Sequence, residues 1–82
     1  MVRLTFKKRA EKELNKLQDN EREKVVRKLR EIVVEPMAGK RLKGEFAGFW
    51  SYRAWPYRII YSFTNDVGVE IFSIEHRQSA YK

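Results

Sequence analysis

Residues 50–63 read Trp-Ser-Tyr-Arg-Ala-Trp-Pro-Tyr-Arg-Ile-Ile-Tyr-Ser-Phe. Aromatic and β-branched residues dominate this stretch, which favours strands, and Pro56 divides it where a tight turn fits. We therefore predict two neighbouring strands, 49–55 and 57–64. A turn at Asn65-Asp66 and a further strand over 67–75 follow. Because no helical segment separates these strands, they should form an antiparallel meander.

Side-chain alternation sorts the residues of these strands between the two faces of the sheet. One face, predicted to be the core, carries Tyr57, Ile59, Tyr61 and Phe63. The outer face of the same strand carries Arg58, Ile60 and Ser62. In the last strand, Val67, Val69 and Ile71 should oppose Glu70, Phe72 and Ile74.

The first half of the chain is predicted to hold a short strand and a helical hairpin. Residues 2–6 alternate as a strand, and apolar residues then recur at helical spacing in two stretches that break at Asp19-Asn20. Thr5 is the expected N-cap of the first helix, and Asn20 with Glu23 resembles a capping box for the second. Residues 36–48 are expected to be irregular. The predicted fold is a single α+β domain over 1–82, of order β-α-α-β-β-β, with both helices on one sheet face.

The charge and composition of the chain limit the functions that it can have. The 82 residues carry a formal net charge of +7, which favours a polyanion or an acidic protein as partner. The absence of cysteine excludes disulfides and thiolate chemistry, and a single histidine leaves no recognisable metal site. No long apolar run is present, so we expect neither a signal peptide nor a membrane span, and a cytoplasmic protein.

Three arginines come from three segments that the predicted fold brings together. Arg53 and Arg58 lie on adjacent strands, and Arg77 follows the last strand. Together they form a reasonable cage for a phosphodiester, while the ring of Trp55, on the face of Arg53, can stack on a base. The alternative is that Arg58 pairs with Glu70 or Glu75.

Two residues near the end of the chain can transfer protons. The imidazole of His76 can donate or accept a proton, and Tyr81 can stack on a base or exchange a proton. The alternatives are a surface histidine and a terminal ring packed on the sheet edge. With no metal or other cofactor implied, RNA cleavage would use the 2′-hydroxyl as nucleophile, which restricts the substrate to RNA.

Several segments resemble the RelE branch of the RelE/ParE superfamily of toxin–antitoxin toxins. The resemblance covers essentially the whole chain and rests on Leu42-Lys43-Gly44, Trp50-Ser51-Tyr52-Arg53, Tyr57-Arg58-Ile59-Ile60-Tyr61, Ile74-Glu75-His76-Arg77 and Tyr81. It implies a metal-independent endoribonuclease that cuts mRNA in the ribosomal A site and so inhibits translation.

The resemblance also implies roles for individual residues. Arg58 and Arg77 match phosphate-stabilising arginines, and Arg53 matches the second of two basic residues on the preceding strand. Tyr81 matches the family's tyrosine, and His76 stands where several relatives have histidine. Ser51 departs from the pattern, because many members have Lys or Arg there.

The implied partners are the ribosome, with its mRNA and ribosomal RNA, and a RelB-like antitoxin bound in a hetero-oligomer. The basic loop residues Lys40, Arg41 and Lys43 suit ribosomal RNA. Two other functions stay open. One is ParE-like inhibition of DNA gyrase, and the other is an RNA-binding or antitoxin-binding module with weak catalysis.

Overall fold

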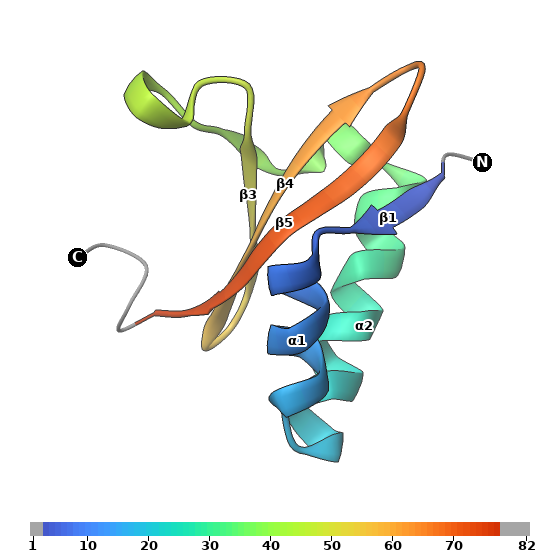
Figure 1. Cartoon of the computed structure of the whole chain (residues 1–82), viewed down its shortest axis with the longest axis vertical. Helices are drawn as coiled ribbons and strands as arrows, with labels where there is room; N and C mark the ends of the chain where they lie inside the picture. The colour runs from blue at the N-terminus through green and yellow to red at the C-terminus, as the bar shows by residue number, and fades with distance from the viewer. Residues whose placement is uncertain (1–2, 78–82) are drawn as a thin grey trace.

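The computed structural model describes residues 3–77, which form a five-stranded sheet packed against two helices (Figure 1). The helices and strands are β1 (Leu4–Phe6), α1 (Lys8–Lys16), α2 (Asp19–Val34), β2 (Lys40–Arg41), β3 (Trp50–Ala54), β4 (Tyr57–Thr64) and β5 (Gly68–His76), with short 3-10 turns η1 (Pro36–Ala38) and η2 (Gly44–Phe46). The sheet order is β1-β5-β4-β3-β2. β1 is parallel to β5, and the other neighbours are antiparallel. The predicted α+β order is confirmed, with the addition of β2.

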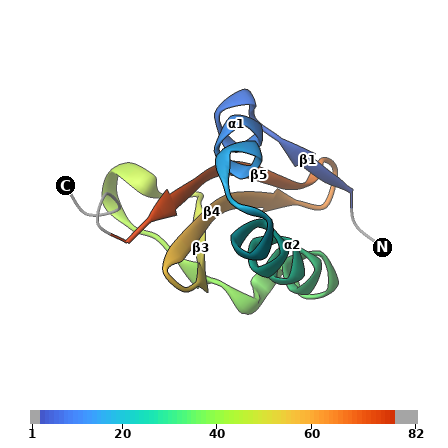
Figure 2. The ribbon, with the colours of Figure 1, turned by 90° about the horizontal axis from the view of Figure 1, so that it is seen from below.

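The core lies between the helices and one face of the sheet. α1 packs on β5 and α2 packs on β3, and Figure 2 shows α1 beside β5. The buried cluster comprises Ala10, Val25, Leu29, Ile32, Ala54, Ile59, Tyr61, Val69, Ile71 and Ile74. Tyr57 and Phe63 are half-buried against it, so the predicted core face of β4 is confirmed. Within residues 3–77, no helix has the length and apolar character needed to cross a membrane.

The helix starts differ from the predicted capping. Thr5 stays in β1, opposite Glu70, and the amide of Lys7 still donates to the Ile71 carbonyl at 2.9 Å. α1 therefore begins only at Lys8. Because α2 begins at Asp19, Asn20 lies inside the helix, where its side chain accepts a hydrogen bond from the adjacent amide. Both capping predictions were wrong.

Arg22 closes the helical hairpin in place of a cap. Its guanidinium donates to the carbonyl oxygens of Leu14 (3.3 Å), Asn15 (3.2 Å) and Leu17 (2.8 Å). The last carbonyls of a helix have no partner within the helix. The Arg22 side chain on α2 thus provides hydrogen-bond donors for the carbonyl groups at the end of α1 and fixes the turn between the two helices.

A β-bulge in β5 changes which residues face the core. Ile60 pairs with Ser73, whereas the next residue, Tyr61, pairs with Ile71, so Phe72 is the extra residue. Alternation restarts after the bulge, and Ile74 is buried in the core beside Ile71. The prediction that these two isoleucines oppose each other was therefore wrong.

The segment predicted to be irregular is anchored by Tyr61. The buried hydroxyl of Tyr61 donates to the Pro36 carbonyl at 2.7 Å and accepts from the Gly39 amide at 3.2 Å. A Cβ at Gly39 would collide with that hydroxyl. With this segment held against β4, Lys40 and Arg41 pair with Ser51 and Trp50 as β2.

α2 is also bound to β3 by a hydrogen bond between side chains. The hydroxyl of Tyr52 donates to the Glu31 carboxylate at 2.7 Å. This bond, with a smaller contribution from Lys28, lowers the pKa of Glu31. It also raises the pKa of Tyr52, and burial adds to that effect.

Candidate functional site

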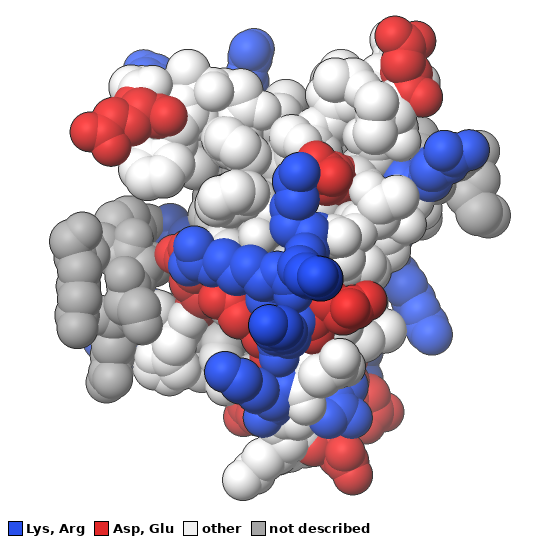
Figure 3. Space-filling view, viewed as in Figure 1, with Lys and Arg blue, Asp and Glu red and all other residues white. Residues whose placement is uncertain are grey.

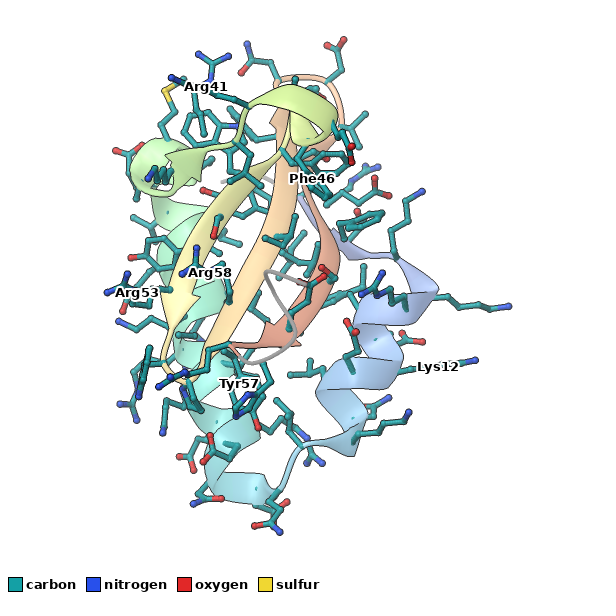
Figure 4. All side chains as sticks on the ribbon, turned by 90° about the vertical axis from the view of Figure 1, so that its left-hand side faces the viewer. Lys12, Arg41, Phe46, Arg53, Tyr57 and Arg58 are labelled. Carbon is teal, nitrogen blue, oxygen red and sulfur yellow. The ribbon has the colours of Figure 1, made fainter. Side chains whose placement is uncertain are left out.

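The sheet face away from the helices, here called the open face, carries the predicted site residues Arg53 and Arg58. Ser51 and Arg53 of β3 alternate with Tyr52 and Ala54, which pack toward the helices. Arg58 of β4 alternates with core residues in the same way. Figure 4 looks onto the strands from this side and shows Arg53 and Arg58 as neighbours.

Arg53 and Arg58 are direct partners in the register of β3 and β4. Arg53 is exposed and Arg58 is half-buried. Guanidinium groups stay protonated at any ordinary pH, and like charges directly opposite one another destabilise a strand pair. Such a pair becomes favourable when a phosphate or another anion binds between the two side chains.

Arg77 and Trp55 meet at the same end of the sheet. The amide of Arg77 donates to the Pro56 carbonyl at 2.8 Å, and its guanidinium lies 4.7 Å from the centre of the Trp55 ring. The Trp55 side chain is 57% exposed, which leaves ring surface accessible. The β3–β4 turn thus gathers a third cation and an aromatic ring beside the Arg53–Arg58 pair.

His76 occupies a different position from the arginines. It is the register partner of Tyr57, and the two rings meet edge to face with centroids 5.4 Å apart. Tyr57 packs toward the core, so strand alternation puts His76 on the helix side, opposite to Arg58 and Glu75. Tyr81 lies outside the described residues.

A pocket of about 200 Å³ adjoins Arg58 on the open face. Its lining residues are Leu42, Phe46, Ser51, Arg58, Ile60, Phe72, Ser73 and Glu75. Phe46 in η2 forms part of the rim and is 52% exposed. The serines are buried, and the walls are mainly apolar.

Glu75 places an acidic side chain beside the arginines of the open face. It is the register partner of Arg58, as one alternative from the sequence anticipated. Its Oε2 accepts a hydrogen bond from Arg9 Nη2 at 3.1 Å and another from Ser73 Oγ at 3.0 Å. Glu70, the other candidate partner, lies 3.8 Å from Lys7 Nζ.

Glu13 continues this network into α1. Its Oε2 accepts from Arg9 Nε at 3.2 Å, and its Oε1 accepts from the amide of Ile74 at 2.8 Å. The second bond satisfies a backbone donor just after the bulge. A chain of bonds therefore runs from α1 to the open face, through Arg9 to Glu75.

The predicted RNA-binding loop lies at the other end of β3. Lys40 pairs with Ser51, and Arg41 pairs with Trp50, whose ring lies 5.6 Å from the Arg41 guanidinium. Lys40, Arg41 and Lys43 are all exposed. Further basic side chains gather over α1, bordered by acidic ones (Figure 3). Among residues 3–77, no group of three or more His, Cys, Asp or Glu side chains is arranged to hold a metal ion.

Residues 4–81 match the family model described as "ParE toxin of type II toxin-antitoxin system, parDE". The chain belongs to the RelE/ParE superfamily of type II toxin–antitoxin toxins. Comparison with curated protein sequences finds no match.

Solved structures similar to this superfamily member include RelE toxins. A chain of the RelBE2 toxin–antitoxin complex of Mycobacterium tuberculosis is 30% identical, with a TM-score of 0.84, over 93% of this chain and 98% of that one. The isolated RelE toxin of E. coli is 28% identical, with a TM-score of 0.78, and the match covers 93% of this chain and 84% of that toxin. A chain of the intact E. coli RelBE complex is 26% identical, with a TM-score of 0.77, and the match covers 93% of this chain and 96% of that one. The predicted membership of the RelE branch is confirmed.

Sequence reasoning missed part of the site of this RelE-like chain. Ser51, noted as a departure from the family pattern, is buried and lines the pocket. Glu75 stood within a quoted motif but was considered only as a counter-ion. Arg9 carried no local signal, because 66 residues separate it from Glu75.

Proposed function

We propose that this toxin cuts messenger RNA in the ribosomal A site and thereby inhibits translation. The observation that carries the proposal is the register pairing of Arg53 with Arg58 on an open sheet face, with Arg77 at the same end. Three permanent cations suit a phosphodiester, whose negative charge grows as the transition state forms. The resemblance to RelE supports RNA on the ribosome as the substrate.

In the proposed reaction the RNA supplies its own nucleophile. The 2′-oxygen attacks the adjacent phosphorus as its proton leaves, and the bond from phosphorus to the 5′-oxygen breaks as that oxygen gains a proton. The products are a 2′,3′-cyclic phosphate and a 5′-hydroxyl. Arg53, Arg58 and Arg77 would stabilise the phosphoryl charge. Of the two candidates for proton transfer, His76 and Tyr81, we favour Tyr81, because His76 lies on the helix side of the sheet.

The partners proposed for this function are the ribosome and an antitoxin. Lys40, Arg41, Lys43 and Trp55 would contact ribosomal RNA or messenger, with an affinity that falls as salt rises. The solved RelBE2 and RelBE structures are toxin–antitoxin complexes, which supports a RelB-like antitoxin and a hetero-oligomer here. We expect the protein to act in the cytoplasm, where translation occurs.

An apolar groove on the helix side supports an antitoxin-binding surface separate from the open face. The groove runs between β1 and α2, and its lining residues are Leu4, Phe6, Leu14, Val26, Leu29, Arg30, Val33 and Val34. β1 is an edge strand of the sheet, with one side paired to β5. Exposed apolar grooves next to a free strand edge are typical protein-binding sites.

Growth arrest in cells tests the proposed site. We expect Arg58→Ala and Arg77→Ala each to abolish arrest, because each removes a cation that neutral residues cannot replace. Arg27→Ala, an exposed arginine on α2, is the matched control and should still arrest growth. Thermal unfolding of the purified variants verifies that the fold is intact. Arrest by both site variants at equal expression would refute the site.

Gyrase inhibition is the second candidate, because the matching family model is that of ParE toxins. A ParE-like toxin would block DNA supercoiling without cleaving RNA. A supercoiling assay with purified gyrase separates the two functions, and we expect no inhibition.

A further inference from the structure

We infer that Lys40 is a further cation of the RNA-cleavage site and contacts the reacting phosphodiester from β2, next to Arg53. This inference rests on the proposed function and adds a residue to its phosphate-binding site. The sequence assigned Lys40 to a basic loop, together with Arg41 and Lys43, and did not predict β2. The pairing of β2 with β3 determines where the Lys40 side chain lies.

This pairing places Lys40 and Arg41 on opposite faces of the sheet. Lys40 is the register partner of Ser51, and Arg41 is that of Trp50. Residues directly opposite in an antiparallel pair share a face. Ser51 lines the pocket beside Arg58, on the open face. Trp50 packs against the core, and its ring lies 5.6 Å from the Arg41 guanidinium. Lys40 therefore projects from the open face, and Arg41 from the helix side.

The position of Leu42 supports this placement independently. Leu42 follows Lys40 by two residues and lines the same pocket as Ser51. Its amide donates to the Phe49 carbonyl at 2.9 Å, which extends the contact between the two chain segments beyond β2. Because side chains two residues apart along a strand share a face, Lys40 and Leu42 both lie on the open face.

Lys40 lies close enough to Arg53 for both to contact one phosphodiester. Ser51 and Arg53 are two residues apart on β3, so Arg53 is a diagonal neighbour of Lys40. Such neighbours are roughly 7–8 Å apart, which is within reach of long side chains. Arg53 in turn lies opposite Arg58. Cations therefore extend across three strands, from Arg58 through Arg53 to Lys40.

Lys40 is the cation of its own row of register partners. That row runs across the open face as Lys40, Ser51, Ile60 and Ser73, and the other three members are neutral. Among residues 3–77, no acidic side chain forms an ion pair with Lys40. Its exposed ammonium group has three donors on a flexible stem, and a phosphate between it and Arg53 would offset the repulsion of two like charges.

The backbone before Lys40 is held in place by the core. The Gly39 amide donates to the Tyr61 hydroxyl at 3.2 Å, and that hydroxyl donates to the Pro36 carbonyl at 2.7 Å. Tyr61 is fully buried, so the start of β2 is fixed against β4. The side chain of Lys40 thus begins from a defined point beside the arginines.

Binding of an RNA that cannot be cleaved tests the inference separately from activity. A fluorescent hexanucleotide with 2′-O-methyl groups has no free 2′-hydroxyl, so its anisotropy reports binding to the full chain alone. We expect Lys40→Ala to weaken binding on the order of tenfold. The slope of log affinity against log salt should also fall by about 0.7, the value of one lost phosphate contact. Lys40→Arg should retain both values.

The matched control is Lys12→Ala, which removes the same charge. Lys12 is exposed and extends from α1 away from the sheet (Figure 4). We expect Lys12→Ala to keep the wild-type salt slope. An unchanged slope in Lys40→Ala, or an equal change in both variants, would overturn the inference.

Ser51→Lys provides a rescue that a merely structural role of Lys40 would not allow. Position 51 lies between Lys40 and β4 on the open face, so a cation there can contact the same phosphate. Adding Ser51→Lys to Lys40→Ala should restore the affinity and the salt slope. Failure of the rescue in a double variant with wild-type thermal unfolding would overturn the inference. If the double variant does not fold, the salt slope of Lys40→Ala decides alone.

Cleavage on programmed ribosomes separates this inference from the proposed function. With ribosomes in excess, Lys40→Ala should cut on the order of tenfold to a hundredfold more slowly than wild type, the effect of one charge-assisted hydrogen bond. A wild-type rate in Lys40→Ala would overturn the inference. Absence of cleavage by the wild type, with oligonucleotide binding that still depends on Lys40, would reject the proposed function alone.

Discussion

Arg58 has a cation and an anion as its two strand neighbours. Arg53 lies opposite on β3 and Glu75 lies opposite on β5. The acidic neighbour offsets part of the repulsion between the two guanidiniums in the free protein. Arg58 can therefore lie opposite Arg53 on the open face with less loss of stability than it would have without Glu75. A bound phosphate would offset the remaining repulsion between the two guanidinium groups.

A second residue-scale feature gives stability a dependence on pH. The hydrogen bond from Tyr52 holds the pKa of Glu31 below its ordinary value of about 4.3. A carboxyl with a lowered pKa stabilises the fold above its ordinary pKa, and that contribution is lost as pH falls through the lowered value.

We therefore expect Tyr52→Phe to reduce the free energy of unfolding more at neutral pH than at about pH 3. Urea unfolding of the wild type and the variant at both pH values gives the two differences. An equal loss at both would show that the charge on Glu31 is not involved.

The neighbours of single residues were predictable only where they are close in the chain. Arg53 and Arg58 flank a tight turn, so their proximity followed from the proline and the alternation of the strands. The bond from Arg9 to Glu75 depends on how α1 packs against the sheet, and no local pattern records it. The position of His76 follows from a bulge that shifts the alternation of β5.

At the scale of elements, the bulge at Phe72 shapes the site. It puts Ser73 on the open face next to the pocket, while Ile71 and Ile74 both stay in the core. The alternation of side chains predicts the face of each strand residue correctly only as far as the first irregularity in the strand. No particular residue type marks a bulge, so the sequence did not reveal this one. β2 was missed because two residues, paired only with β3, are too few to show a period.

Glu13 links this bulge to α1, which leads to an element-scale prediction. Glu13→Ala leaves the amide of Ile74 without its acceptor and should cost about 1–3 kcal/mol in free energy of unfolding. Glu13→Gln keeps an acceptor oxygen and should cost less. Urea denaturation measures both, and equal losses would mean that the hydrogen bond contributes little.

On the scale of the whole molecule, the two surfaces proposed for binding lie on opposite sides of the sheet. The open face carries the arginines and the pocket, whereas the apolar groove lies between β1 and α2. The sequence predicted the helical hairpin and the basic charge. It did not predict the groove, because β1 and α2 meet there only in the folded protein.

Because the two proposed surfaces are separate, we expect that antitoxin binding can be weakened without loss of the proposed cleavage. Val34 lines the groove and is 84% exposed, so Val34→Asn should leave folding unchanged and weaken antitoxin binding by roughly tenfold. Val67→Asn is the matched control, because Val67 is 53% exposed in the β4–β5 turn. Calorimetric titration with a RelB-like antitoxin that binds the wild-type toxin measures both. Equal affinities for the two variants would exclude the groove.

Primer extension on a defined messenger tests the central claim most directly. The protein is incubated with the messenger in the presence and absence of programmed ribosomes, in parallel with Arg58→Ala and Arg27→Ala. We predict cleavage at A-site codons only with ribosomes, lost in Arg58→Ala and retained in Arg27→Ala. Intact messenger with wild-type protein that still arrests growth would contradict ribonuclease function and favour gyrase inhibition.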